Sequence, residues 1–223
     1  MNNSPQFSSS SKGGFTLMEM MVVLLIIGIL SGTFVVNAPG WIDKANMTAS
    51  QKNMSRIYST LLDYQGNHDG AWPRDQGQKF FLRPWKDGMV EKTEQQAKMY
   101  FSPSESFNDI MLYNGLEDED LTMAEYLNDW EAIGPGYTSY AGFTTGGDRD
   151  LFRRLRKNPG STAIVSDAHM IHRTALLYLT ADGATHRLNR AEIEDITGID
   201  LELDDIDPGP GCEIEVLQTV SND

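Results

Sequence analysis

The sequence predicts an α+β protein in which one long N-terminal helix, membrane-spanning in its first half, packs on an antiparallel sheet and carries a variable insertion. Three observations predict this class. An apolar run ends near residue 36, a helical amphipathic pattern follows over residues 41–65, and short strand patterns around a tight turn lie beyond residue 163. With 223 residues, the chain is long enough to form one domain of ordinary size after the helix.

The charge of the chain is −14, and nearly all of it lies beyond the helix. Residues 66–223 hold 29 acidic and 14 basic side chains, a net charge of −15. Such a surface repels nucleic acid and offers no general attraction to anionic lipid, so we expect no nucleic-acid partner. The single cysteine, Cys212, excludes an internal disulfide framework and a cysteine-based metal cluster.

The first 36 residues combine a hydrophilic leader with an apolar helix. Residues 15–36 supply 22 residues, or about 33 Å of helix, which is enough to cross a hydrocarbon layer of about 30 Å. A removable secretory signal has its cleavage site after the apolar run. Here Pro39 directly follows the small-residue stretch ending at Ala38 and fits a peptidase poorly. An ordinary removable signal is therefore a poor explanation of this segment.

The leader side of the helix carries a more specific pattern. Gly13-Gly14-Phe15-Thr16-Leu17, with Lys12 before it and Glu19 just beyond, resembles the signal of type IV prepilins and type II secretion pseudopilins. The resemblance implies that a membrane-embedded prepilin peptidase cuts after Gly14 on the cytoplasmic face. The same enzyme would then N-methylate Phe15, and the apolar helix would be retained.

The resemblance also implies a pilin-like fold, a location and a set of partners. The expected segments are a leader at 1–14, a helix at 15–65 (transmembrane at 15–36, amphipathic at 41–65) and a globular domain at 66–223. Lys12 lies before the helix and would hold the leader end in the cytoplasm. The protein would cross the bacterial inner membrane once, with its globular domain periplasmic, or extracellular if the filament is a pilus. The expected partners are prepilin peptidase, other pilin or pseudopilin subunits and an inner-membrane assembly platform.

Glu19 is an acid within the apolar run. An ionised acid inside a membrane span costs about 2.5 to 3.5 kcal/mol and is read as functional by default. The resemblance implies a partner, the N-terminal amino group of an adjacent subunit, which would set the register of assembly. The alternative is an acid close enough to the helix start to stay hydrated. Gly28 and Gly32 form a GxxxG pattern that lets helices approach closely in lipid, or else simply adds flexibility.

The helix is expected to continue beyond the membrane. Pro39 and Gly40 predict a kink or short break. After it, apolar residues at three- and four-residue spacing predict a stripe that packs against the sheet: Met54, Ile57, Tyr58, Leu61 and Leu62. Turn-forming residues predict that the helix ends near residues 64–66. Beyond that end, the spacing of Tyr64, Gly70, Trp72, Pro73 and Gly77 resembles a pseudopilin pattern.

Residues 74–148 show mixed periodicity, and the resemblance implies that they form a variable insertion on the pilin scaffold. We expect a strand or helical turn at 80–82, helices at 91–99 and 121–130, and a strand at 137–142. Residues 99–104 are similar to a segment of a large subfamily of bacterial pilin-like proteins, which usually has cysteine where Ser102 stands.

The clearest strand signals lie in the C-terminal half. Strands are expected at 163–166, 174–180 and 184–188, with Asp182-Gly183 as a hairpin turn in which glycine accepts a positive φ. His172 precedes this turn by nine intervening residues, which resembles the His-x9-Asp-Gly signature of the same subfamily. A short helix should then begin at Asn189, with Ile193 and Ile196 inward and Gly198 as its stop, before a last strand at 214–220.

The sequence shows no convincing catalytic constellation. Asp167, His169 and His172 lack the spacing of a metal site, and solvated or turn-stabilising histidines are the preferred interpretation. Beyond Arg190 the chain has 11 acids and no bases, which suits a solvated acidic face or, as an alternative, calcium.

We therefore expect a structural filament subunit with no enzymatic activity and no resident cofactor. One alternative is a membrane-anchored periplasmic binding module that does not polymerise. A more remote alternative is a metal-dependent enzyme that uses His169 and His172.

Overall fold

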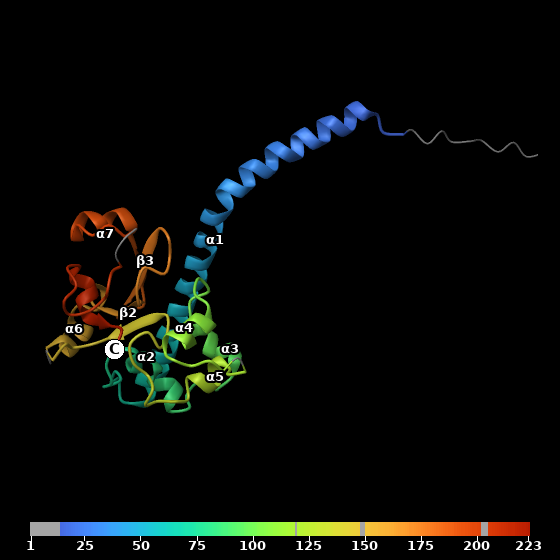
Figure 1. Cartoon of the computed structure of the whole chain (residues 1–223). Coiled ribbons are helices and arrows are strands. Elements are labelled where there is room, and N and C mark those ends of the chain that lie inside the picture. Colours follow the sequence, from blue (N-terminus) through green and yellow to red (C-terminus); the bar gives the residue numbers. More distant parts are fainter. Residues whose placement is uncertain (1–13, 119, 148–149, 202–204) are drawn as a thin grey trace, which may run out of the picture. The chain divides into compact units, whose positions relative to one another are not determined.

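The computed structural model describes residues 14–118, 120–147, 150–201 and 205–223 (Figure 1). The class is α+β, as predicted: a long helix, α1 (Leu17–Asn67), and a five-stranded antiparallel sheet with short helices. The chain divides into two compact units, residues 1–42 and 43–223. The predicted leader, including Lys12, lies outside the described residues apart from Gly14.

The first unit contains the apolar part of α1. The stretch Leu17–Val35 is long and apolar enough to cross a membrane, with a mean hydropathy of 2.2, and none of it is buried within the protein. Helical structure continues through Pro39 and Gly40, so the short break predicted there is wrong. Proline already has a helical φ; it removes one hydrogen bond from the helix, and the remaining turns continue without interruption.

The second half of α1 provides the buried stripe that the sequence predicts. Met54, Ile57 and Leu61 are fully buried, and Tyr58 packs against the same core from its edge. Leu62 is 44% exposed, so its assignment to the stripe is wrong. It stands about 100° around the helix from Leu61, at the edge of the apolar face, where it reaches solvent.

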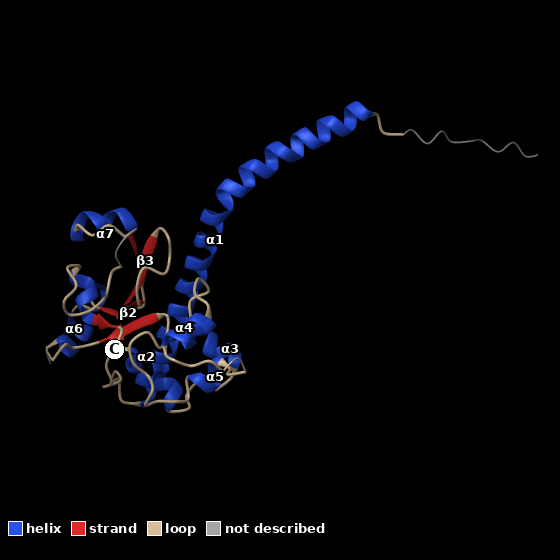
Figure 2. Ribbon diagram, viewed as in Figure 1, coloured by secondary structure: helices blue, strands red, loops and turns tan. Residues whose placement is uncertain are grey.

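The sheet has the strand order β4-β3-β2-β1-β5, and every neighbouring pair is antiparallel. Figure 2 shows its strands in red, and their bounds are β1 (Tyr140–Phe143), β2 (Ala163–Asp167), β3 (Ala175–Thr180), β4 (Thr185–Asn189) and β5 (Val220–Ser221). The strands predicted at 137–142, 163–166, 174–180 and 184–188 are confirmed with small shifts of their ends. The predicted last strand is mostly wrong, because 3₁₀ helix η3 (Glu215–Thr219) occupies it and only its final residue is in β5.

Both faces of the sheet are covered. In β3, Leu177 and Leu179 face the cluster that includes the buried stripe of α1. Leu176, the residue before Leu177, faces a second cluster with Leu188, Ile193 and C-terminal residues. This alternation is the period of two that a strand imposes on its side chains. The strand therefore carries buried apolar residues on both sides, because each face has its own core.

Short helices fill the region predicted as an insertion, residues 74–148, and the segment between it and β2. Their bounds are α2 (Gln78–Lys86), α3 (Glu94–Ala97), η1 (Lys98–Tyr100), α4 (Phe107–Tyr113), α5 (Met123–Tyr126), α6 (Leu151–Lys157) and η2 (Pro159–Ser161). The short element expected at 80–82 is part of α2. The helix expected at 121–130 is only the four-residue α5 (Met123–Tyr126). A capping box between Thr122 and Glu125 marks its start.

Helix α7 (Arg190–Thr197) follows β4 directly, as predicted. Gly198 closes it with φ 69°, the left-handed conformation that glycine adopts at no steric cost. Ile193 is fully buried, but Ile196 is 49% exposed and its predicted inward orientation is wrong. The two residues are three apart, and the narrow contact of a two-turn helix covers only the first of them.

Candidate functional site

The start of α1 is a capping box formed by Thr16 and Glu19. Glu19 Oε2 accepts hydrogen bonds from the Thr16 backbone N–H at 2.8 Å and from Thr16 Oγ1 at 2.9 Å. The Glu19 N–H in turn donates to Thr16 Oγ1 at 3.2 Å. The pair satisfies two backbone donors that a helix N-terminus leaves open. Glu19 therefore has a partner inside its own chain, which our sequence reasoning missed although the Thr-x-x-Glu motif is visible there.

The predicted cleavage site lies directly before this cap. Gly14, Phe15 and Thr16 are not helical, and Phe15 is 78% exposed. A Cβ built on Gly14 would meet no atom within 4 Å. The helix thus begins at Leu17, with Thr16 as its capping residue. The Gly14–Phe15 peptide bond lies before it and is open to solvent.

Gly28 and Gly32 lie one helical turn apart on α1. Both are exposed, and a Cβ at either position would meet nothing within 4 Å. The fold of a single chain therefore does not require glycine at these positions. Their small size leaves a shallow place on one helix face, which allows the backbone of a second helix to approach closely in lipid.

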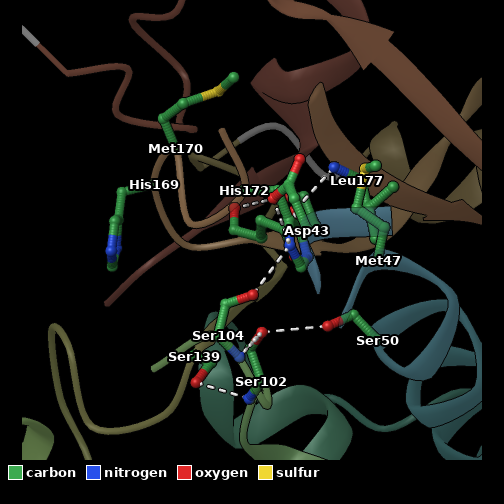
Figure 3. A network of polar contacts seen from close by, with 12 residues as sticks. Asp43, Met47, Ser50, Ser102, Ser104, Ser139, His169, Met170, His172 and Leu177 are labelled. Carbon is green, nitrogen blue, oxygen red and sulfur yellow. Dashed lines mark hydrogen bonds and ion pairs between the residues drawn. The ribbon is translucent and has the colours of Figure 1, made fainter. Parts of the chain in front are cut away.

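His172 lies at the centre of a buried polar network (Figure 3). Its Nδ1 is 3.1 Å from Ser104 Oγ and 3.9 Å from Asp43 Oδ1, and its Nε2 is 3.9 Å from Asp167 Oδ2. Burial lowers the pKa of His172, so the imidazole is neutral at pH 7. The prediction of a solvated or turn-stabilising histidine is wrong for His172, because segments distant in sequence enclose it.

His169 belongs to a different group. It is partly exposed and pairs with Glu105, with Nε2 and Oε1 3.0 Å apart. The hydrogen bond to Glu105 raises the pKa of His169. Figure 3 shows the His169 ring to the left of the His172 network, with no contact drawn between the two. The structure therefore does not bring His169 and His172 together as the two ligands that the metal-enzyme alternative needs.

The network has the residue types of a hydrolase triad without its geometry. Ser104 hydrogen-bonds to His172, but the 3.9 Å between His172 and Asp167 is too long for a hydrogen bond. Among the residues that the structure describes, no three His, Cys, Asp or Glu side chains group closely enough to hold a metal ion. Of the acidic tail considered for calcium, Glu202 and Asp204 lie outside the described residues.

Asp167 is a fully buried acid on β2. Its Oδ2 accepts a hydrogen bond of 2.7 Å from the Leu177 N–H on β3, whereas Oδ1 has no hydrogen-bond partner within the described part of the chain. Burial raises the pKa of Asp167 well above its usual value. The side chain is therefore held toward its neutral, protonated form, which burial favours.

Replacing Asp167 by asparagine should stabilise the fold increasingly as the pH rises. The folded protein keeps the Asp167 proton to a higher pH than the unfolded chain, whose aspartates titrate near 3.8. The stability that this proton contributes is present at low pH. It is lost as the pH rises from about 4 toward the folded pKa, by at most ~1.4 kcal/mol per pH unit. An asparagine stays neutral and still accepts from the Leu177 N–H.

The measurement is urea unfolding of both full-length proteins in detergent between about pH 4 and pH 8. His172 and Glu105 titrate in both proteins, so the difference in unfolding free energy isolates Asp167. A difference that does not change with pH would contradict the raised pKa.

The His172 and Asp182-Gly183 signature lies at the two ends of β3, and α1 contacts both ends. Just before β3, Asp43 accepts hydrogen bonds from the Arg173 N–H at 3.0 Å and from Thr174 Oγ1 at 2.8 Å. Just after β3, Tyr58 Oη donates to the Ala181 carbonyl at 3.2 Å. Asp43 and Tyr58 are about 22 Å apart along the helix, close to the roughly 20 Å length of a six-residue strand.

The turn itself is shaped for this contact. Asp182 Oδ1 accepts from Thr180 Oγ1 at 2.6 Å and from the Ala184 N–H at 3.1 Å, which closes the hairpin. Gly183 has φ 89°, and a Cβ there would lie 2.5 Å from the Tyr58 ring. The glycine is therefore required twice, by its backbone angle and by the aromatic ring packed on it.

Together, the fold and the start of α1 define a membrane-associated, pilin-like α+β protein with an exposed apolar helix directly after a candidate processing site. Comparison with known proteins agrees with this class. Residues 9–35 match the family model of the prokaryotic N-terminal methylation motif. No solved structure matches the chain.

Three chlamydial proteins, each named "Putative outer membrane protein", are similar to the chain. The one from Chlamydia trachomatis serovar D is 30% identical over 97 residues, covering 36% of this chain and 77% of the relative. The one from Chlamydia muridarum is 28% identical over the same length with the same coverage. The one from Chlamydia pneumoniae is 39% identical over 51 residues, 23% of this chain and 42% of the relative. The chain belongs to the same family as these proteins, and it carries a type IV prepilin-like signal.

Proposed function

We propose that the chain is a structural subunit, a pseudopilin or pilin-like protein, of a type II secretion or type IV pilus-like filament. Prepilin peptidase cuts it after Gly14 and methylates Phe15, and the mature subunit assembles through α1. The observation that carries this proposal is the methylation motif at residues 9–35 placed directly on an exposed apolar helix.

The exposed helix is suited both to the subunit in the membrane before assembly and to the subunit in the filament. An apolar surface of 19 residues with none buried needs a cover, because exposed apolar area is costly in water. Lipid covers it before assembly, and the helices of other subunits cover it in the filament. Gly28 and Gly32 permit close helix contacts in both settings.

Glu19 has a different partner at each stage. In the single chain its carboxylate accepts the Thr16 hydrogen bonds of the capping box. After cleavage, Phe15 carries a free amino group next to Thr16. In the filament, the amino group of a neighbouring subunit pairs with Glu19 and sets the register. A carboxylate has acceptor capacity for both roles.

The proposed location is the bacterial inner membrane, crossed once, with the N-terminus cytoplasmic and the globular domain periplasmic until assembly. Its partners are prepilin peptidase, other subunits and the assembly platform. We propose no enzymatic activity and no resident cofactor. In support, the residue types that suggested catalysis belong to a network whose histidine and aspartate are fully buried.

A membrane-anchored binding module is the second candidate. The observation that favours it is an open cavity of about 1110 Å3 in the globular unit. Polar and aromatic side chains, including Ser104, Glu105, Tyr113 and His169, line this cavity. A module of this kind would act as a monomer, whereas a filament subunit must contact its copies through α1.

Cysteine cross-linking separates the two candidates. Cys212 is the only native cysteine, so a Cys212→Ala chain with Ser31→Cys carries one thiol, between Gly28 and Gly32. We expect disulfide-linked dimers in membranes of producing cells, and several-fold fewer when Gly28→Leu fills the shallow helix face. Monomers alone under oxidising conditions would contradict assembly through this helix and favour the binding module.

A further inference from the structure

We propose that Trp41, together with Phe34, docks in the outer interfacial layer of the bilayer, where lipid carbonyl and headgroup atoms meet water. The pair thereby sets the depth of the membrane helix. This inference rests on the proposed membrane-spanning state and adds to it a named contact with lipid and a fixed position for Glu19.

The two aromatic side chains form one exposed patch on α1. Trp41 is 55% exposed and Phe34 is 60% exposed. Their ring centroids are 5.7 Å apart with an interplanar angle of 67°, an edge-on contact. They are seven residues apart, which places them on one face of the helix after two turns. Neither residue is in the buried cores of the globular unit, so folding alone does not explain this patch.

The position of the patch matches the end of the apolar span. The membrane-length stretch ends at Val35, between the two aromatic residues. Tryptophan combines a large apolar body with one polar N–H, and it is enriched where hydrocarbon gives way to headgroups. Side chains on a helix also lean toward its N-terminus, so the Trp41 ring covers the turn before it and extends back toward the apolar span.

Two polar side chains near this end donate a hydrogen bond within the helix. Thr33 Oγ1 donates to the Leu30 carbonyl at 2.9 Å, and Asn37 Nδ2 donates to the Thr33 carbonyl at 2.7 Å. Because their donors bond to the helix itself, the hydrocarbon boundary can lie beyond Thr33 at a smaller desolvation cost. Trp41 is then suited to mark the outer interface.

The anchor fixes where Glu19 lies. Glu19 and Trp41 are 22 residues apart, or about 33 Å along a helix with ~1.5 Å rise per residue. A typical helix tilt of about 20° reduces this to about 31 Å across the bilayer, against a hydrocarbon thickness of about 30 Å. With Trp41 in the outer interface, Glu19 is at the inner boundary, where its carboxylate stays hydrated. The Gly14–Phe15 bond then lies on the cytoplasmic side, where the peptidase needs it.

Quenching of tryptophan fluorescence by brominated lipids tests the anchor. The full-length chain is reconstituted in phosphatidylcholine vesicles whose acyl chains carry bromine either near the headgroup or near the chain end. The other three tryptophans belong to the globular unit, so the quenchable signal comes from Trp41. We expect quenching at least ~2-fold stronger with bromine near the headgroup, and loss of this difference in Trp41→Phe.

A second variant tests the membrane-spanning state independently of the Trp41 anchor. In the Trp41→Phe background, Leu30→Trp places the reporter midway between Glu19 and Trp41, where bromine near the chain end should quench it most. Deep quenching at position 30 together with no shallow preference at Trp41 would overturn the anchor and leave the spanning state standing. No quenching at either position would overturn both. A chain with the expected quenching that is never cleaved after Gly14 would keep the anchor and contradict the proposed function.

Discussion

Glu19→Lys should abolish filament assembly while the chain still inserts in the membrane. The lysine would face the N-terminal amino group of the neighbouring subunit, so a favourable ion pair becomes a repulsion in a medium of low dielectric constant. Breaking a buried ion pair costs about 3 to 5 kcal/mol, which lowers the association constant of each subunit contact by a hundredfold or more. Sheared filaments quantified by immunoblot measure assembly, and carbonate extraction of membranes measures insertion.

Two control variants separate the charge of Glu19 from its capping role. Glu19→Gln keeps a side-chain acceptor for the Thr16 N–H but has no charge, and it should assemble as poorly as the lysine variant. Thr16→Ala weakens the cap by about 1 kcal/mol but keeps the charge, and it should still form filaments. Normal filament yield from Glu19→Gln would show that the ion pair does not set the register.

Gly183→Ala should destabilise the globular unit by about 2 to 4 kcal/mol. One part of the cost is backbone strain, because the position has φ 89°. The larger part is the new Cβ, which would lie 2.5 Å from Cε1 and 2.9 Å from Cδ1 of Tyr58. The ring must move, and its hydrogen bond to the Ala181 carbonyl is then lost. Urea unfolding of the full-length protein in detergent measures the change.

Gly198→Ala is the matched control for this prediction. Gly198 also has a positive φ, 69°, but a Cβ there would meet nothing within 4 Å. It should therefore cost only the backbone strain, about 1 kcal/mol. Equal losses from the two variants would show that the Tyr58 contact does not matter. Tyr58→Ala should make the two glycine substitutions nearly equal, since it removes the ring that causes the clash.

Sequence reasoning found the features that are contiguous in the chain. The apolar run, the candidate cleavage site and Glu19 lie within a few helical turns, and β2, β3 and β4 are marked by apolar runs and an Asp-Gly turn. The capping box of Thr16 and Glu19 is also contiguous and could have been recognised by its Thr-x-x-Glu spacing.

The burial of His172 could not be predicted in the same way. Its neighbours Ser104, Asp43 and Asp167 come from three separate parts of the chain, and only the tertiary fold encloses the imidazole. Leu62 and Ile196 show a related limit. A helical pattern identifies an apolar face but not how far the packed neighbour extends over its edge.

The prediction of the C-terminal strand at 214–220 was mostly wrong for a third reason. A short apolar run is compatible with strand or helix, and periodicity alone does not decide between them. Here Leu217 packs inward from a 3₁₀ turn, and only Val220 and Ser221 pair with β1.

In the proposed function, assembly, the role of Glu19 and retention of the helix all depend on cleavage after Gly14. Mass spectrometry of the protein purified from membranes of cells that contain prepilin peptidase measures it directly. The predicted result is a mature chain that begins at an N-methylated Phe15. A mature chain that begins at Met1, or at any residue other than Phe15, would contradict it.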